Sequence, residues 1–181
     1  AVSQAPLLYE NKYQLINGQG AILFTYQKHE PVPGEPSRKG KEPLQVFSVE
    51  NIRLGGAICY DYDFPYLAKG FAQSGANIVA VPSSDWRGID PIHTHMAAFR
   101  AVEQGHSILR STRFGLSAAM LPTGEMVAKM SSFDQNDRIM MANLPTKGAW
   151  TLYSVIGDVW IYLSLGFVVW FLFNAWRKPN P

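Results

Sequence analysis

The stretch that decides the fold covers residues 52–84, IRLGGAICYDYDFPYLAKGFAQSGANIVAVPSS. The apolar run over 52–58 predicts a strand, and the apolar spacing over 65–74, with Pro65 in its first turn, predicts a helix. A second apolar run over 77–84 predicts a strand that is covered on both faces. Strand, helix and strand in this order indicate an α/β layered fold.

The rest of the chain extends this pattern. Two β-prone runs flank the turn NGQG and predict a hairpin, and a loop rich in proline and glycine follows over 29–43. A second helix is expected over 93–105. The further strands are expected over 11–16, 21–28, 44–49, 106–112, 115–121, 126–130 and 138–144.

Composition supports a single packed domain and excludes several classes of protein. Hydrophobic residues make up 47% of the 181 residues and charged residues 17%, which favours a core over disorder. The net charge of +2 is small and the basic residues are scattered, so we expect no nucleic-acid partner. The single cysteine excludes an internal disulfide.

The C-terminal part differs from the rest in carrying an uncharged apolar run over 159–176. As a helix this run is roughly 27 Å long, close to the hydrocarbon thickness of a bilayer. Tryptophans stand at both of its ends and Arg177 and Lys178 follow, as in membrane anchors. We therefore predict a domain over 1–150 and a transmembrane helix with a short basic tail over 151–181. The alternative is a buried core helix.

Cys59 raises the question of chemistry. A cysteine is nucleophilic as the thiolate, which needs a nearby cation, base or helix N-terminus. Here the residue is expected at the end of a strand, shortly before the helix that begins near Pro65. The alternative is a small buried residue, because free cysteines are among the most buried residue types.

Five motifs in order carry a resemblance to a known family: YQKHEPVPGE, GGAICYD, VPSSDW, RAVEQGHSILRST and PTGE. The series resembles the nitrilase (carbon–nitrogen hydrolase) superfamily. Within it, the chain is most similar to the C-terminal part of the apolipoprotein N-acyltransferases, which also have the membrane helix. The resemblance implies a nitrilase-like α-β-β-α layered sandwich, with its N-terminal part missing, followed by a C-terminal transmembrane helix.

The resemblance also implies a catalytic set. By position Cys59 matches the nucleophile, Lys28 the catalytic lysine and Glu35 a glutamate that assists catalysis. An ammonium group near the thiol would lower its pKa and hold an oxyanion. The alternatives are a solvated charge at a strand end for Lys28 and a surface carboxylate for Glu35.

Three further residues are expected at the substrate or the oxyanion. The Tyr60 backbone N–H is the natural second oxyanion donor. Asp61 stands where a glutamate is usual in the acyltransferases, so its reach is shorter. Trp86 follows a stretch that departs from the family pattern, and packing explains an aromatic residue there as well.

One part of the family pattern is absent. The general base is a glutamate on an early strand well upstream of the lysine, whereas 27 residues precede Lys28 and Glu10 is too close to the hairpin. Either the chain is the C-terminal part of a longer protein, as Ala1 suggests, or it is a degenerate copy.

Other candidate sites are weaker. His93 and His95 are too close in sequence to share a helix face, so we expect no metal site, and His93 is expected to be structural. Arg110 and Arg113 are expected at a solvated strand edge. No phosphate-binding loop is present in the sequence, and no cofactor is expected.

The expected function is transfer of a fatty acyl group from a phospholipid, through a cysteine thioester, to the N-terminal amino group of a lipoprotein. Membrane, phospholipid and lipoprotein would be its partners. The expected location is the bacterial cytoplasmic (inner) membrane, with the catalytic domain on the outer, periplasmic face. The alternatives are a membrane-tethered nitrilase-type amidase and a non-catalytic module that binds lipid or a partner.

Overall fold

The computed structural model describes residues 8–134 and 139–177. Its strands are β1 (Lys12–Ile16), β2 (Ile22–Gln27), β3 (Phe47–Val49), β4 (Ile52–Gly56), β5 (Ile78–Ala80), β6 (Ser83–Ser84), β7 (Ser107–Arg110), β8 (Thr112–Arg113), β9 (Leu116–Met120) and β10 (Met126–Ser131). Its helices are the 3₁₀ helix η1 (Cys59–Asp63) and the α-helices α1 (Pro65–Gln73), α2 (Ile92–Gln104), α3 (Leu152–Ile156) and α4 (Val159–Arg177).

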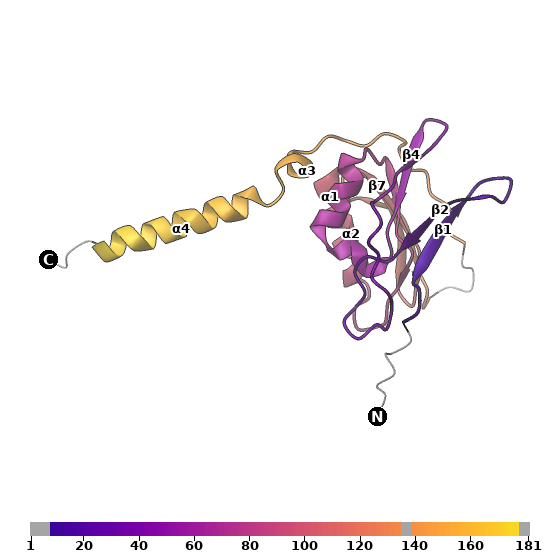
Figure 1. Cartoon of the computed structure of the whole chain (residues 1–181), viewed down its shortest axis with the longest axis horizontal. Coiled ribbons are helices and arrows are strands. Elements are labelled where there is room, and N and C mark those ends of the chain that lie inside the picture. The colour runs from indigo at the N-terminus through magenta and orange to yellow at the C-terminus, as the bar shows by residue number, and fades with distance from the viewer. Residues whose placement is uncertain (1–7, 135–138, 178–181) are drawn as a thin grey trace, which may run out of the picture.

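A six-stranded sheet forms the centre of the domain, in the order β10-β9-β7-β5-β4-β3. The central strands β4, β5 and β7 are parallel, and antiparallel strands pair on either side. Helices α1 and α2 cover one face of this sheet, and the antiparallel β1–β2 hairpin lies on the opposite side (Figure 1). The α/β layered architecture predicted from the sequence is confirmed.

The core between the sheet and the two helices explains Gly55, one of the two glycines before Cys59. Phe71 of α1 is fully buried in this core. A Cβ atom at Gly55 would stand 2.7 Å from its ring, so the strand needs glycine there to let the helix approach. At the other end of the layer, Gly105 ends α2 with a φ of 70°, a conformation that glycine adopts readily.

Two sequence predictions are corrected by the structure, and one short helix was missed. Residues 139–144 form no strand, and Ile139 and Met141 are exposed, because this segment pairs with no strand among the described residues. Ala80 of β5 is exposed, so that strand is buried on one face rather than two. A cavity of about 410 Å³ lies between the hairpin and this open face. The short helix α3 was not predicted.

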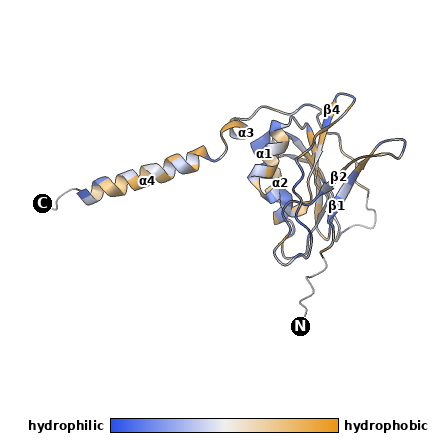
Figure 2. Cartoon of the chain, in the orientation of Figure 1, coloured by the Kyte–Doolittle hydropathy of each residue, from blue (hydrophilic) through white to orange (hydrophobic). Residues whose placement is uncertain are grey.

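Helix α4 extends away from the sheet and its helices (Figure 1) and is apolar along its length (Figure 2). It has the length and composition of a membrane span, and none of its residues is buried. The alternative of a buried core helix is therefore wrong. In water this surface would be a large exposed apolar patch, which marks a site of interaction with a membrane or a protein.

Candidate active site

Cys59 occupies a strained turn between the sheet and α1. Strand β4 ends at Gly56, and Cys59 begins η1 with a φ of 50°, a left-handed conformation that a non-glycine residue rarely adopts. Its backbone N–H donates to the Pro82 carbonyl at 3.0 Å, and its Sγ lies 3.8 Å from the Ser84 carbonyl oxygen. The cysteine thus stands just past the strand end predicted for it, and η1 separates it from α1. Strain of this kind is typical of functional turns.

Lys28 lies one residue beyond β2 and is 2% exposed. Its Nζ donates to Glu35 Oε2 at 2.7 Å, so the two charges form a buried ion pair. A buried ammonium requires such a partner. The alternative of a solvated charge at a strand end is wrong for Lys28.

The Glu35 carboxylate is held by its own loop. Pro33 and Gly34, whose φ is 86°, form a turn that is closed by the Glu35 N–H donating to the Val32 carbonyl. The carboxylate in turn accepts from the Val32 N–H at 2.9 Å and from Asn11 Nδ2 at 2.8 Å. Burial raises the pKa of Glu35, but these bonds and the Lys28 ammonium outweigh it and lower the pKa to about 2. Glu35 is therefore a fixed anion rather than a proton carrier at neutral pH.

Asp61 joins the segment that carries Lys28 to the turn that carries Cys59. Its carboxylate accepts from the Ile58 N–H at 3.0 Å on one side. On the other side it accepts from the Tyr26 hydroxyl at 2.9 Å and from the N–H groups of His29 and Glu30. The side chain is fully buried. We expected Asp61 at the substrate, but its oxygens are used within the fold, so the structure gives it a positioning role.

A cavity of about 490 Å³ opens beside Cys59. It is lined by Tyr9, Asn11, Lys12, Tyr13, Lys28, Val32, Glu35, Ile58, Cys59, Pro82, Ser83, Ser84 and Arg113. Three of the six predicted site residues, Lys28, Glu35 and Cys59, share this cavity although they come from separate segments. We name it the Cys59 pocket.

The other three predicted residues do not line the Cys59 pocket. Asp61 is fully buried and bonded within the fold, as described above. The half-buried Tyr60 packs its ring edge-on against Phe64, with 5.1 Å between the ring centroids, and follows Cys59 in η1. The Trp86 side chain is 56% exposed and does not line the pocket, so the structure does not support the expected contact with a substrate bound there.

Two features near Cys59 were missed by sequence reasoning. Arg110, expected at a solvated edge, is buried and donates to Asp85 through both Nη1 and Nη2 at 3.1 Å. Arg113 is exposed as expected, but it lines the Cys59 pocket and donates to Ser84 Oγ. Asp85 and Arg110 are 25 positions apart, so no local sequence pattern indicates that they pair.

The arrangement can support covalent chemistry at sulfur. A nucleophilic side chain, a fixed ammonium group and a cavity of ligand size meet at one place. The ammonium would favour negative charge on the sulfur and on an oxygen that develops charge in the pocket. Glu10, by contrast, is exposed and pairs with Lys12.

Comparison with known proteins agrees with this geometry. The model of the carbon–nitrogen hydrolase family matches residues 3–150. Among curated proteins, the chain is 32% identical over 124 residues to apolipoprotein N-acyltransferase 1 of Treponema denticola, covering 66% of this chain and 23% of that protein. It is 28% identical over 143 residues to the deaminated glutathione amidase of Homo sapiens, covering 67% of this chain and 44% of that protein.

A solved structure of an amidase from Nesterenkonia sp. AN1 in complex with butyramide matches with a TM-score of 0.61 and 25% identity, covering 65% of this chain and 50% of that one. The chain thus spans a quarter to a half of the length of these relatives. Because the family model covers most of its residues, the chain belongs to the carbon–nitrogen hydrolase family.

Proposed function

We propose that this chain carries the nucleophile of an acyltransferase that moves a fatty acyl group from a phospholipid to the N-terminal amino group of a lipoprotein. The observation that carries the proposal is the meeting of Cys59, Lys28 and Glu35 at one pocket in a chain that also has an exposed apolar helix. Similarity to apolipoprotein N-acyltransferases supports the acyl donor and acceptor.

In the first half-reaction the Cys59 sulfur attacks the ester carbonyl of the phospholipid. The thiol proton passes to a general base, for which the resemblance expects a glutamate upstream of Lys28. The carbonyl oxygen becomes an oxyanion beside the Lys28 ammonium and the Tyr60 N–H. Collapse of this intermediate breaks the ester C–O bond. The base returns the proton to the leaving oxygen, which departs as a lysophospholipid and leaves an acyl thioester on Cys59.

In the second half-reaction the free α-amino group of the lipoprotein attacks the thioester. The same oxyanion donors serve again, and the C–S bond breaks. The base takes a proton from the amine and gives it to the departing sulfur, so that the amide product and the free thiol are formed. Glu35, an anion at neutral pH, keeps the Lys28 ammonium in place through both steps.

Helix α4 supports a membrane setting for this reaction. The helix is long enough to cross a bilayer. Both proposed substrates reside in the membrane, one as a phospholipid and the other through its lipid anchor. With Arg177 on the cytoplasmic side, the pocket would lie on the outer face of the inner membrane. Trp86, exposed beyond the pocket, would then be available to the membrane interface.

The test is to trap the acyl-enzyme. The protein, expressed from its complete reading frame, is incubated in phosphatidylethanolamine vesicles and its intact mass is measured. We expect a gain of one acyl chain that hydroxylamine removes, and no gain for Cys59→Ala. Lys28→Met should slow trapping about 100- to 1000-fold, the range for loss of an oxyanion donor. Lys41→Met, at an exposed lysine outside the Cys59 pocket, is the matched control and should keep the wild-type rate.

A second candidate is a membrane-tethered amidase, and the similarity to two amidases favours it. In that case water would resolve the thioester, and a small soluble amide such as butyramide would release ammonia in a Cys59-dependent reaction. Turnover of the amide without acyl trapping would select this candidate. If neither reaction depends on Cys59, the chain is a non-catalytic module.

A further inference from the structure

A second buried group of charges, outside the Lys28–Glu35 pair, lies against Cys59. At its centre is His93, from the first turn of α2, whose side chain is buried. Its Nδ1 lies 2.7 Å from Asp85 Oδ1, and its Nε2 lies 2.9 Å from Asp63 Oδ1. A neutral imidazole has one N–H, whereas each ring nitrogen of His93 faces a carboxylate, which favours the doubly protonated imidazolium. Arg110 Nη2 also lies 2.9 Å from His93 Nδ1 and its charge opposes this protonation, but the two carboxylates outweigh it.

Protonation of His93 is consistent with its surroundings. Burial lowers the pKa of His93, but the hydrogen bonds to Asp63 and Asp85 outweigh it and raise the pKa to about 9. The Asp85 carboxylate receives Arg110 as a second cation. The pKa of Asp85, which burial would raise, is lowered by its hydrogen bonds with His93 and Arg110. Two cations and two carboxylates therefore balance in this group.

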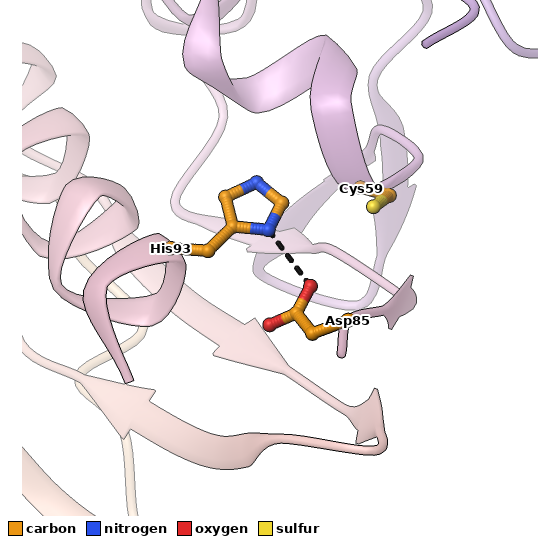
Figure 3. A group of neighbouring side chains, drawn as sticks. All are labelled: Cys59, Asp85 and His93. Atoms are coloured by element: carbon orange, nitrogen blue, oxygen red, sulfur yellow. Dashed lines mark hydrogen bonds and ion pairs between the residues drawn. The ribbon is translucent and has the colours of Figure 1, made fainter. Parts of the chain in front are cut away.

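The group lies close to the nucleophile and includes a residue of its turn. The Cys59 sulfur, a carboxylate oxygen of Asp85 and a ring nitrogen of His93 lie within 4.8 Å of one another. Figure 3 shows the cysteine beside the dashed contact between the histidine and the aspartate. Asp63 is the last residue of η1, the helix that Cys59 begins. His93 thus holds the far end of the nucleophile's own turn.

This position makes the imidazolium important for the charge on the sulfur. Without the imidazolium, the group would hold the two carboxylates of Asp63 and Asp85 but only one cation, Arg110. The group beside the sulfur would then carry a net negative charge. Such a charge disfavours a thiolate and raises the pKa of a thiol. Among the described residues, the other charged or titratable groups that line the Cys59 pocket, belong to η1 or hydrogen-bond with its side chains are Tyr9, Lys12, Tyr13, Tyr26, Lys28, Glu35, Tyr60, Asp61, Tyr62, His106 and Arg113.

We propose that His93 is a positioning residue for Cys59, whose imidazolium cancels the Asp63 and Asp85 charges beside the sulfur and so allows the thiolate to form. The proposal rests on the proposed function in taking Cys59 as the nucleophile. It assigns to the α2 histidine a role in the chemistry, where the sequence suggested a structural one.

The pH dependence of Cys59 alkylation tests this proposal. Cys59 is the only cysteine in these 181 residues, so iodoacetamide labelling is measured by mass spectrometry on the peptide that contains it, with Cys59→Ala as the blank. The rate follows the thiolate fraction. His93→Gln should raise the apparent pKa of the thiol by about one unit and slow labelling at neutral pH about tenfold. Asp63→Asn, which keeps an oxygen for the His93 Nε2–H and removes one negative charge, should shift the pKa in the opposite direction.

His106→Gln is the matched control. His106 is also buried and also contacts η1, through the Tyr62 hydroxyl, but burial lowers its pKa to about 4 and leaves it neutral. A purely structural effect would appear in both histidine variants, whereas the proposal expects it in His93→Gln alone.

Shifts of opposite sign for the His93 and Asp63 variants support the proposal, and shifts of the same sign, or none, overturn it. If His93→Gln fails to fold, Asp63→Asn decides alone, since an unchanged or raised pKa contradicts the proposal. Labelling requires no acyl donor, so opposite shifts without acyl trapping would refute the proposed function and leave the role of His93 intact.

Discussion

The surroundings of Cys59 and the helix α4 depart from the usual placement of side chains in opposite ways. Around the cysteine the chain buries Lys28, Asp61, Asp85 and Arg110, residue types that are almost never fully buried unless paired. Along α4 it exposes an uninterrupted apolar surface. Each departure is costly in water, and each indicates what that region contacts.

The two costs are offset differently. The buried charges are satisfied by ion pairs and hydrogen bonds with partners among the described residues. No residue of α4 is buried by the other described residues, so its apolar surface needs a partner outside the chain. The comparison therefore separates a charge network that is satisfied within the chain from an anchor that needs an outside partner.

The largest expected effect breaks the anchor. Val168→Arg puts a charge at the middle of α4, where insertion costs about 2.5–3.5 kcal/mol, and should reduce membrane retention about a hundredfold. Val159→Arg, the same change at the end of the helix near the expected interface, should be tolerated. Flotation of the protein with phospholipid vesicles measures both. Equal retention of the two variants would show that α4 does not enter the bilayer.

The predictable parts of the fold are those set by neighbouring residues. The β1–β2 hairpin follows from two β-prone runs around NGQG. Helix α1 begins at Pro65 and helix α2 ends just before Gly105, as the sequence predicts. The strand predicted over 139–144 is wrong because a local β propensity does not provide the neighbouring strand with which a segment must pair. Resemblance to a family, rather than local pattern, indicated Lys28, Glu35 and Cys59 as a set.

The roles of Asp61 and Arg110 could not be read from the sequence. The partners of Asp61 include Tyr26, 35 positions away, and the partner of Arg110 is 25 positions away. Such contacts depend on how β2, η1 and β7 are brought together by the sheet, which no local pattern encodes. Both residues were assigned to the surface or to the substrate, and both are buried positioning groups.

The next effect in size weakens the buried charge network around Cys59. Asp61→Asn replaces one carboxylate oxygen by an NH2 group that cannot accept, which leaves the donors on that side without a partner at a cost of about 1–3 kcal/mol. We expect thermal unfolding at a clearly lower temperature and slower alkylation of Cys59. Asp158→Asn, at an exposed carboxylate that accepts from the Tyr153 hydroxyl, is the control and should change neither. An unchanged unfolding temperature for Asp61→Asn would refute the bridging role.

The last effect concerns pH and distinguishes the two regions again, since α4 contains no Asp, Glu, His or Cys. The pKa of His93 is raised from 6.5 to about 9 in the folded protein. Its contribution to stability is therefore complete below pH 6.5 and is lost as the pH rises towards 9, because the folded state binds the proton more tightly. The stability difference between wild type and His93→Gln should shrink by about 2 kcal/mol between pH 6.5 and 8.5.

Denaturant unfolding in detergent at both pH values measures this change. His106→Gln should show a constant difference over the same range, because the pKa of His106 is lowered to about 4 and the folded group stays neutral. A difference for His93→Gln that grew with pH would mean that His93 is neutral in the folded protein. Its two carboxylate neighbours would then share a proton, and the cancellation of charge beside Cys59 would have to come from Arg110 alone.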